Sequence, residues 1–413
     1  MKQETVNKLK IFNDPVYGFI NIPFELVYDL IEHPFFQRLR RIKQLGMSHL
    51  VYPGALHTRF HHAMGAVHLM ELALNVLKQK GHEITKEEEE ATIVAILLHD
   101  IGHGPFSHSL ENILIEGVGH EQISSELMEI LNQEMNGALT LGLSIFNGTY
   151  HKKFLHQLVS SQLDMDRLDY LKRDSFFTGV SEGVISTDRI IKMLNVHDDK
   201  IVVDAKGIYS IEKFIVARRL MYWQVYLHKT VVSAEHLLIK IIQRAKFLVT
   251  KGEELFATPA LKYFLDKKEK QSTLSKQDID YFVQLDDTDI YSSIKVWTKH
   301  SDKTLSYLCA SLVNRKLFRI KMKDEEFGIE EVEEIKQKIK MHFKLSEEEV
   351  EYYFIQKSVS NKAYISNSGS IDILNKDGSI NDIAKAADLL NISALSAAVN
   401  KYFICYPKVI DTI

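Results

Sequence analysis

Residues 91–101 form a segment that is apolar on every side of a helix until it reaches an imidazole and a carboxylate, His99 and Asp100. A helix without a polar face has to be surrounded by protein, so this segment should occupy the centre of a helical bundle. Thr85, with Glu88 three residues later, marks its start with the pattern of a capping box. The Gly-His-Gly-Pro sequence that follows should end it, because proline cannot continue a helix.

An ionisable pair at the end of a buried helix is costly unless its charge is paired or bound to a metal. A single pair has a simple explanation, in which the histidine bonds a carbonyl group and the aspartate caps the next turn. The surroundings favour chemistry instead, because half of the 18 histidines lie between residues 57 and 120. Such a local enrichment is typical of a functional site.

Two further helices are predicted to bring candidate metal ligands to the same bundle axis. One, from residue 59 to residue 80, carries His62, and a later one carries Asp164, Asp166 and Asp169. Imidazole and carboxylate groups from several helices are the usual ligands of a metal site in a bundle. This mixed set suits Mn, Mg, Fe, Zn or Ni and does not choose among them. The alternative for the three aspartates is a solvated helix face, with Arg167 and Lys172 as salt-bridge partners.

Further titratable groups follow the central pair, namely His103, His108, Glu111 and His120. Histidine titrates near neutral pH and can donate a proton to a leaving oxygen. Each of these histidines, taken alone, is more simply a satisfied core or surface residue.

Phosphate binding, if present, has to rest on side chains and metal, because the sequence contains neither of the common glycine-rich phosphate motifs. The basic candidates are Arg59, Arg167, Arg218, Arg219 and Lys229. Arg59 matters most, because it lies one helical turn before His62 on the same face and could hold a phosphate with two nitrogens. Its alternative is an exposed arginine at a helix start.

The whole sequence predicts a mainly α protein in two parts. Residues 23–45 predict two helices, the second from residue 34 to residue 45, and further helices are expected at 120–135, 152–175 and 211–250. Beyond residue 250, helical stretches mix with strand-like segments such as 317–322 and 352–356. We therefore expect a helical core from 1 to 250, containing one small hairpin at 198–209, and a smaller mixed α+β lobe from 251 to 413.

Composition excludes several classes of protein. A net charge of -4 leaves no electrostatic footprint for nucleic acid or for a membrane surface. Two cysteines, Cys309 and Cys405, cannot build a disulfide framework. No apolar leader and no uncharged apolar run of membrane-spanning length is evident, so a cytoplasmic location is the default expectation.

Several sequence strings together resemble a known family. They are Phe12-Asn-Asp-Pro-Val-Tyr-Gly18, Thr58-Arg-Phe-His-His62, His99-Asp-Ile-Gly-His-Gly-Pro-Phe-Ser-His108 and Asp166-Arg-Leu-Asp-Tyr170. The set is similar to the deoxynucleoside triphosphate triphosphohydrolases, a branch of the HD-domain metal-dependent phosphohydrolases, over roughly residues 10–240. The resemblance implies a helical HD-domain core that hydrolyses deoxynucleoside triphosphates (dNTPs) to a deoxynucleoside and inorganic triphosphate.

Carried over position by position, the resemblance implies a divalent metal ion held by His62, His99, Asp100 and Asp166. Catalytic roles would fall to the histidine-rich segment, with His103 and His120 contacting phosphate, Glu111 orienting an imidazole and His108 protonating the leaving 5′ oxygen. Other residues would bind the substrate: for the phosphates, Arg59, Arg218 and Lys229; for the sugar, Gln44, Leu45, Tyr170, Asp174 and Tyr226.

The resemblance also implies partners. Nucleotide activators bind relatives at subunit contacts, and the matching positions here are Glu32, Gln37 and Arg40, for which an ordinary amphipathic helix face is the alternative. A homodimer or homotetramer is expected, with the lobe after residue 250 helping assembly. Two other functions stay open: another HD-domain nucleotide phosphohydrolase, such as a nucleotidase or a signalling-nucleotide phosphodiesterase, and a catalytically silent regulatory or nucleic-acid-binding protein.

Overall fold

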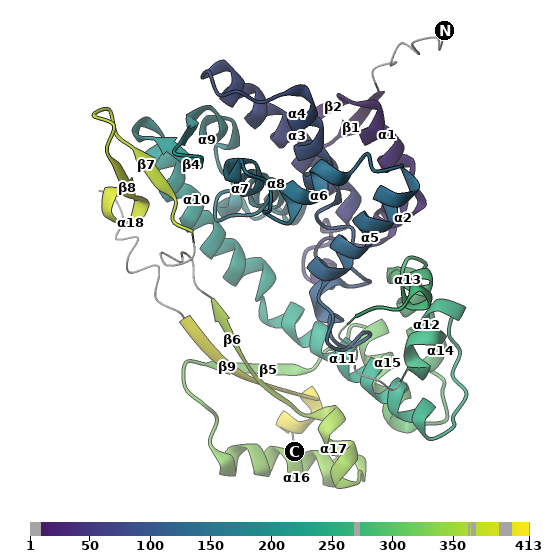
Figure 1. Cartoon of the computed structure of the whole chain (residues 1–413). Coiled ribbons are helices and arrows are strands. Elements are labelled where there is room, and N and C mark those ends of the chain that lie inside the picture. Colours follow the sequence, from purple (N-terminus) through teal and green to yellow (C-terminus); the bar gives the residue numbers. More distant parts are fainter. Residues whose placement is uncertain (1–9, 268–272, 362–363, 365–368, 388–398, 413) are drawn as a thin grey trace.

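The computed structural model describes residues 10–267, 273–361, 364, 369–387 and 399–412. Within them the protein is mainly helical, as the sequence predicts, with three small sheets. Figure 1 shows a large helical body and, below it, a smaller part in which helices and strands mix. None of the described helices is both long enough and apolar enough to cross a membrane.

Three helices form the centre of the large body. They are α3 (Arg59–Gln79), α4 (Lys86–Leu98) and α8 (Met165–Thr178), and α3 packs against both of the others. Every residue of α4 from Ala91 onward is buried, which confirms the prediction of a central helix. The predicted capping box is present: the Thr85 amide donates to Glu88 Oε2 over 2.9 Å, and the Glu88 amide donates to Thr85 Oγ1 over 3.2 Å.

Other elements complete the chain up to residue 250. A hairpin of β1 (Lys10–Asp14) and β2 (Gly18–Ile22) precedes the three central helices. The remaining helices of this part are α1 (Glu25–Glu32), α2 (Pro34–Gln37), α5 (His120–Glu134), α6 (Thr140–Phe146), α7 (Lys153–Val159), α9 (Thr187–Met193), α10 (Ile208–Met221) and α11 (Lys229–Thr250).

Three of the predicted long helices are interrupted. The one expected at 34–45 ends in a 3-10 turn at Arg38–Arg41, because the chain then extends so that Lys43 can bridge to Thr58. The one expected at 152–175 breaks into α7 and α8, because Asp164 caps α8 by accepting from the Arg167 amide over 2.7 Å. The one expected at 211–250 breaks at a π-turn, Tyr222–Tyr226.

Among the described residues beyond α11, the chain forms seven helices, all three strands of one sheet and two of the four strands of another. The helices are α12 (Pro259–Asp266), α13 (Lys276–Phe282), α14 (Asp287–Trp297), α15 (Lys303–Val313), α16 (Ile329–Phe343), α17 (Glu347–Tyr353) and α18 (Ile383–Ala386). One sheet is antiparallel in the order β5 (Arg319–Lys323), β9 (Val399–Tyr406), β6 (Ile355–Asn361). The strand expected at 317–322 is confirmed as β5, whereas the one expected at 352–356 starts later, at Ile355, because α17 occupies the residues before it.

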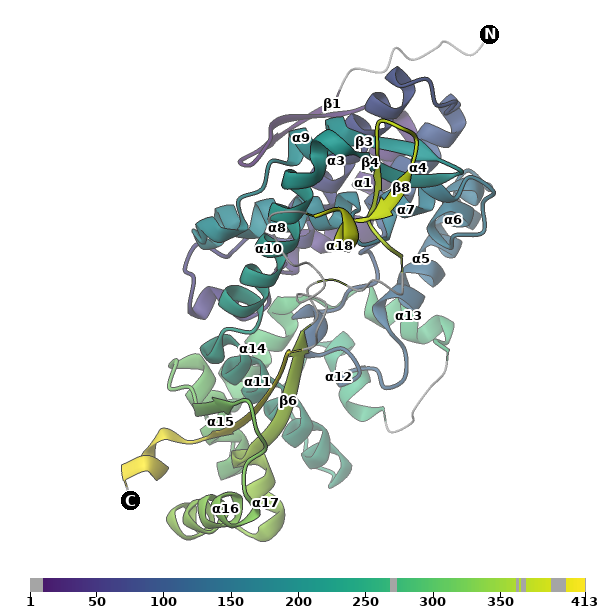
Figure 2. The same cartoon turned by 90° about the vertical axis from the view of Figure 1, so that its left-hand side faces the viewer.

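The last sheet joins distant parts of the chain. The hairpin expected at 198–209 is present but lies earlier, as β3 (Leu194–His197) and β4 (Lys200–Asp204), because residues 205–207 form a 3-10 turn and α10 begins at Ile208. β7 (Asp372–Leu374) pairs with β4 in parallel, followed by β8 (Ile380–Asp382). Figures 1 and 2 both show β7 and β8 lying beside the large helical body, far from the β6–β9 pair. The chain therefore returns to the core at β7 and β8 before β9 completes the sheet of the smaller part.

Candidate metal centre and nucleotide site

Three of the predicted metal ligands converge at one point between α3, α4 and α8. A ligand atom from each of His62, His99 and Asp166 lies within 4.8 Å of the others. Asp166 Oδ1 is 3.0 Å from His62 Nε2 and 3.6 Å from His99 Nε2. Asp100 lies at the edge of this group, with Oδ2 3.7 Å from His62 Nε2 and Oδ1 3.4 Å from His99 Nε2.

Each of the two imidazoles has its Nδ1 atom beside a hydrogen-bond acceptor and its Nε2 atom directed toward Asp166. His62 Nδ1 is 2.7 Å from Asp169 Oδ2, and His99 Nδ1 is 2.6 Å from the Ile96 carbonyl oxygen. A proton on each Nδ1 satisfies these acceptors and leaves the Nε2 lone pairs available. Both Nε2 atoms are buried and form no hydrogen bond among the described residues. Two imidazole lone pairs and two carboxylates form a donor set that fits a divalent metal ion.

The electrostatic environment of this centre favours positive charge. Burial lowers the pKa of the His62 imidazole, but the carboxylates of Asp166 and Asp169 outweigh burial and raise that pKa to about 10. Burial lowers the pKa of His99 as well, and Asp100 and Asp166 raise it above its ordinary value. The field that stabilises a proton on these rings also stabilises a bound cation.

Behind His62 lies a buried ion-pair network that the sequence did not reveal as such. Asp169 is fully buried and accepts from Arg173 Nε over 3.0 Å and Nη2 over 3.1 Å, and Arg173 Nη1 donates to Asp14 Oδ2 over 2.7 Å. The network needs a glycine on α3, since a Cβ at Gly65 would lie 2.0 Å from Asp169 Oδ1. Asp169 therefore orients a ligand, and Asp164, which caps α8, lies outside the cluster of ligand atoms.

Arg59 is not the exposed helix-start arginine of the alternative prediction, because its side chain is buried beside the centre. Its Nη1 donates to Asp100 Oδ2, and its Nε donates to Ser107 Oγ over 2.8 Å. Burial raises the pKa of Asp100, but His99 and Arg59 outweigh burial and hold that pKa well below its usual range. The guanidinium therefore lies directly beside the candidate metal centre.

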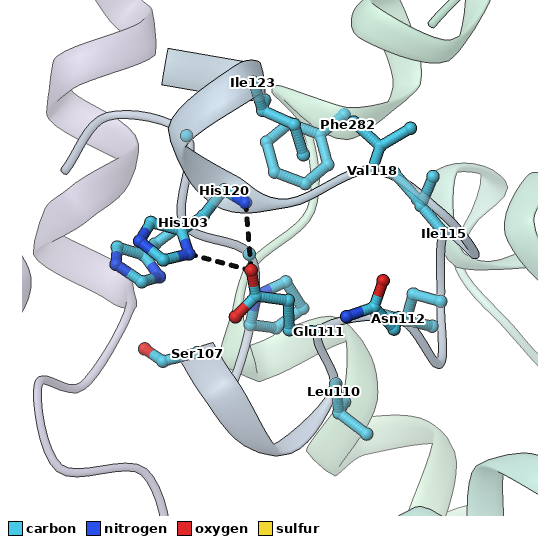
Figure 3. Close-up of a pocket in the computed structure, with 14 residues that line it drawn as sticks. His103, Ser107, Leu110, Glu111, Asn112, Ile115, Val118, His120, Ile123 and Phe282 are labelled. Atoms are coloured by element: carbon cyan, nitrogen blue, oxygen red, sulfur yellow. Dashed lines mark hydrogen bonds and ion pairs between the residues drawn. The ribbon is translucent and has the colours of Figure 1, made fainter. Parts of the chain in front are cut away.

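The loop after α4 brings three of the predicted catalytic residues together (Figure 3). The rings of His103 and His120 stack with their centroids 3.9 Å apart, and Glu111 Oε1 accepts from the His120 amide over 3.0 Å and lies 2.8 Å from its Nδ1. Burial and the charge of Arg59 hold the pKa of His103 well below its ordinary value, so this ring is neutral at neutral pH. The fourth predicted residue is His108, whose side chain lies outside the described part of the structure.

A small cavity of about 40 Å³ lies beside these three side chains. Its other walls are mostly apolar and include Leu110, Ile115, Val118, Ile123 and Phe282. The stacked imidazoles are thus packed against apolar surface on one side.

The predicted sugar residues on α8 and in the π-turn also meet. Tyr226 donates its hydroxyl to Asp174 Oδ2 over 2.7 Å, and its ring lies edge-on to that of Tyr170 at 6.2 Å. His57 Nε2 is 2.8 Å from the other oxygen of Asp174, and its ring stacks on Phe177. Asp174 is almost fully buried, so His57 and Tyr226 hold its carboxylate from both sides.

Other predicted substrate residues lie around this group. The backbone N–H of Gln44 donates to the His57 carbonyl over 3.0 Å. The side-chain oxygen of Gln44, Oε1, is buried without a hydrogen bond among the described residues. Leu45, next to it, is half-buried. Arg218 is buried on α10 and interacts electrostatically with Tyr170, whereas Lys229 is exposed at the start of α11.

The three predicted effector residues lie near one another at the surface. Gln37 donates to the Ile31 carbonyl over 2.7 Å and accepts from Arg40 Nε over 2.8 Å. The Arg40 guanidinium stacks over the Phe60 ring at 3.5 Å. Partial burial lowers the pKa of Arg40, whereas the negative charge of Glu32 acts to raise it. Arg40 and Glu32 stay exposed.

Three side chains of this site were not singled out by sequence reasoning for the roles they take. They are His57, which holds Asp174, Ser107, which holds Arg59, and Asp169, which holds His62. Asp169 had a readable signal, since it lies three residues after Asp166 and four before Arg173, both on one side of a helix. The other two depend on contacts between distant parts of the chain, and no local pattern marks them.

Comparisons with known proteins agree with this geometry. A family model described as the HD domain matches residues 59–173, and one described as the HD associated region matches residues 185–256. An uncharacterized Bacillus subtilis protein, YwfO, is 33% identical over 97% of this chain and 92% of its own length. The deoxynucleoside triphosphate triphosphohydrolase SAMHD1 homolog of Dictyostelium discoideum is 31% identical over 60% of this chain, which spans about half of that relative, 51%.

A solved structure resembles nearly the whole chain. The crystal structure of a phosphohydrolase from Bacteroides thetaiotaomicron superposes with a TM-score of 0.94 at 53% sequence identity and covers 97% of this chain and 100% of its own. The likeness includes the part beyond the two matched family regions.

Proposed function

The chain belongs to the HD-domain phosphohydrolase family, and on that premise we propose that it hydrolyses deoxynucleoside triphosphates to a deoxynucleoside and inorganic triphosphate. Relatives that carry this activity in their names match a little over half of the chain. Support for the substrate therefore comes from the side chains of the site.

The observation that carries the proposal is a stripe of three side chains on α8. Asp166, Tyr170 and Asp174 follow one another at intervals of four residues, so they lie along one side of the helix. Asp166 belongs to the metal centre, whereas Asp174 and Tyr170 belong to the group around Tyr226. A ligand along this stripe would place a phosphate at the metal centre and a sugar against the two tyrosines.

The metal ion would be held by His62, His99, Asp166 and Asp100, and when bound it supplies Lewis-acid chemistry, favouring ionisation of water and neutralising phosphate charge. Arg59 would add a fixed cation beside the α-phosphate, where charge develops as the reaction proceeds. Because Asp100 and Ser107 already hold its guanidinium, little reorganisation is needed when the substrate binds.

The histidine-rich loop would handle phosphate contacts and protons. Glu111 fixes His120 through Nδ1, so that His120 Nε2 faces away from the carboxylate. His103, whose Nε2 lies 3.3 Å from Asp100 Oδ1, would contact a phosphate bound at the metal centre. The oxygen of a water molecule would form a bond to the α-phosphorus as the bond between that phosphorus and the 5′ oxygen breaks, and the water would release one proton to solvent. The departing 5′ oxygen then takes a proton, for which His108 stays the predicted donor.

The sugar group suggests selection against ribose. The Tyr226 ring, held by its hydrogen bond to Asp174, and the Tyr170 ring beside it would lie against the 2′ side of the sugar and leave little room for a hydroxyl group. Asp174 would accept a hydrogen bond from the 3′ hydroxyl, since a carboxylate has more acceptor positions than His57 and Tyr226 occupy.

Product analysis tests the proposal. The purified protein is incubated with each dNTP and each ribonucleotide in the presence of Mn²⁺, Mg²⁺, Fe²⁺, Zn²⁺ or Ni²⁺, and the products are separated by anion exchange. We expect inorganic triphosphate and a deoxynucleoside from dNTPs, and much slower turnover of ribonucleotides. Release of pyrophosphate or orthophosphate, or a preference for monophosphates or cyclic nucleotides, would identify another HD-domain phosphohydrolase instead.

We further propose that nucleotides activate the protein at Glu32, Gln37 and Arg40, and that it works as a homodimer or homotetramer to which the part beyond residue 250 contributes. The Gln37–Arg40 hydrogen bond and the exposed Glu32 carboxylate offer donors and acceptors of the kind that recognise a purine edge. Mass photometry with and without added dGTP tests both points: a shift in subunit number supports the proposal, and one unchanged monomer peak contradicts it.

A further inference from the structure

The loop that carries the catalytic histidines contains two consecutive residues in an unusual backbone conformation. Phe106 has φ 52° and Ser107 has φ 48°, and neither is a glycine. Side chains other than glycine rarely adopt this left-handed region, and they persist there only where the surroundings hold them. Both residues are buried, so the surrounding protein has to supply the holding contacts.

A carboxylate that lies 181 positions further along the chain supplies such a contact. Asp287, the first residue of α14, accepts from the Phe106 amide through Oδ1 over 2.9 Å and from the Lys43 amide through Oδ2 over 3.0 Å. The Lys43 ammonium group lies 3.7 Å from the same Oδ2. Asp287 is only 4% exposed and lies outside both regions that match a family model.

A second contact fixes the same segment against the loop. Arg38 is fully buried and donates to the Ile101 carbonyl over 2.7 Å and to the Leu285 carbonyl over 3.3 Å. The loop is therefore tied at its start through Arg38 and at Phe106 through Asp287. Both contacts involve the segment 285–287, through the Leu285 carbonyl and the Asp287 carboxylate.

The strained pair of residues leads directly to the predicted phosphate-binding group. Ser107 accepts from Arg59 Nε over 2.8 Å, and the other end of the same guanidinium contacts Asp100. A rotation of the backbone at Phe106 or Ser107 would move Ser107 Oγ and release one side of Arg59. The chain of contacts from Asp287 to Arg59 thus has two steps, Phe106 to Ser107 and Ser107 to Arg59.

We propose that Asp287 is a positioning residue for the reaction: it holds the Phe106–Ser107 backbone so that Ser107 fixes the Arg59 guanidinium in the geometry that binds phosphate. The proposal rests on the proposed function, in which Arg59 meets the α-phosphate. It assigns a role in catalysis to a residue beyond position 250, and it requires that the metal centre be left intact when the role is lost.

The test uses the full-length Asp287→Asn variant. An amide side chain offers one acceptor oxygen, so only one of the two backbone N–H groups stays satisfied. We expect kcat/KM for dNTPs to fall by roughly 10- to 100-fold, because a displaced binding group is costly even when it lies far from the mutation. The affinity for Mn²⁺, measured by titration calorimetry, should stay within about twofold, since Asp287 touches none of the metal ligands.

A double-mutant cycle with Ser107→Ala separates positioning from a general loss of structure. If Asp287 acts through Ser107, the double variant should be no worse than the poorer single variant, whereas independent effects multiply. Asp302→Asn is the matched control, because Asp302 also accepts from a backbone amide, that of Leu305 over 2.7 Å, and also faces a cation, Arg244. That variant should lose stability but keep the parent kcat/KM.

Two readouts do not need turnover. In Asp287→Asn, hydrogen exchange of the Phe106 amide should become at least about tenfold faster and the affinity for inorganic triphosphate should fall about tenfold, with neither change in Asp302→Asn. If the parent hydrolyses no dNTP, the proposed function fails while these two measurements still decide the role of Asp287. Unchanged exchange and triphosphate affinity, or multiplying effects in the cycle, would overturn the proposal, and if Asp287→Asn does not fold, Ser107→Ala alone has to show the loss of triphosphate affinity.

Discussion

The metal centre and the loop that follows it are neighbours, but they are held in place in different ways. The His62 and His99 imidazoles are held by Asp169 of α8 and by the Ile96 carbonyl of α4, and Arg173 links Asp169 to Asp14 of the first strand. The loop from residue 101 to residue 120 is held largely from elsewhere, by Arg38, by Asp287, and by Lys246, which donates to the Ile113 carbonyl over 2.6 Å.

Metal binding and turnover should therefore be separable in this protein. The four candidate ligands all lie within the region that matches the HD domain, residues 59–173, so we expect metal binding to depend little on the chain beyond residue 250. The loop geometry depends on the part beyond residue 250, so that part can alter turnover without altering the metal. Variants of the metal centre should therefore lose metal affinity and turnover together, whereas variants that disturb the loop should lose turnover alone.

The largest effect is expected from Asp166→Ala, on the metal side. It removes the oxygen that lies 3.0 Å from His62 Nε2 and 3.6 Å from His99 Nε2. Both metal affinity and dNTP hydrolysis should be lost, with turnover reduced by about a thousandfold or more, since the metal and the groups around it supply most of the rate enhancement. Calorimetry and product analysis measure the two losses. Asp188→Ala, an exposed aspartate in the first turn of α9, is the control and should behave as the parent.

A smaller effect with the same signature is expected from Asp169→Asn. The amide can no longer compensate the His62 Nδ1 proton with a negative charge, and it leaves Arg173 with a weaker partner. Loss of such a supporting carboxylate typically costs about 10- to 100-fold in metal affinity or activity. Metal affinity and turnover should fall together here, in contrast to Asp287→Asn. Turnover that fell alone would break the distinction between the two regions.

Gly65→Ala probes the packing behind the centre. The new methyl group would lie 2.0 Å from Asp169 Oδ1 and 2.2 Å from Arg173 Nη2, so the buried ion pair has to shift. We expect a loss of about 1–3 kcal/mol in the free energy of unfolding, as for other overpacked cores, together with weaker metal binding. Chemical denaturation with and without Mn²⁺ measures both. A variant as stable as the parent would show that the pair has room to move.

The smallest effect is expected on the loop side, from Glu235→Gln. Burial of Glu235 beside Ser109 raises the pKa of its carboxyl from 4.5 to about 7. The folded state thus holds this proton over a pH range in which the unfolded chain has released it, so the parent loses stability as the pH rises from 4.5 to 7. Glutamine avoids that loss, and the variant should be about 1–2 kcal/mol more stable than the parent at pH 8 and equal to it at pH 4. Urea titrations at the two pH values measure the difference.

Much of the helical core could be predicted from the sequence because its signals are local. The uniform apolar character of residues 91–98 and the cap at Thr85 mark α4, and His99 and Asp100 follow directly. The breaks at Asp164 and at the π-turn were missed, because a capping side chain inside an amphipathic pattern looks like part of its polar face.

The supporting contacts of the site could not be predicted in the same way. Asp287 and Phe106 are 181 positions apart, and His57 and Asp174 are 117 apart. No periodicity links such residues, because their meeting depends on how whole helices pack. Among the supporting residues only Asp169 carried a local signal, whereas His57, Ser107 and Asp287 became visible as supports only in the folded chain.

Anomalous diffraction from crystals soaked with Mn²⁺ tests the central claim most directly. The account predicts one strong peak bound by His62 Nε2, His99 Nε2 and oxygens of Asp166 and Asp100, at about 2.0–2.3 Å from each. A peak at another place on the molecule, or no peak while these four side chains stay as they are, would contradict it.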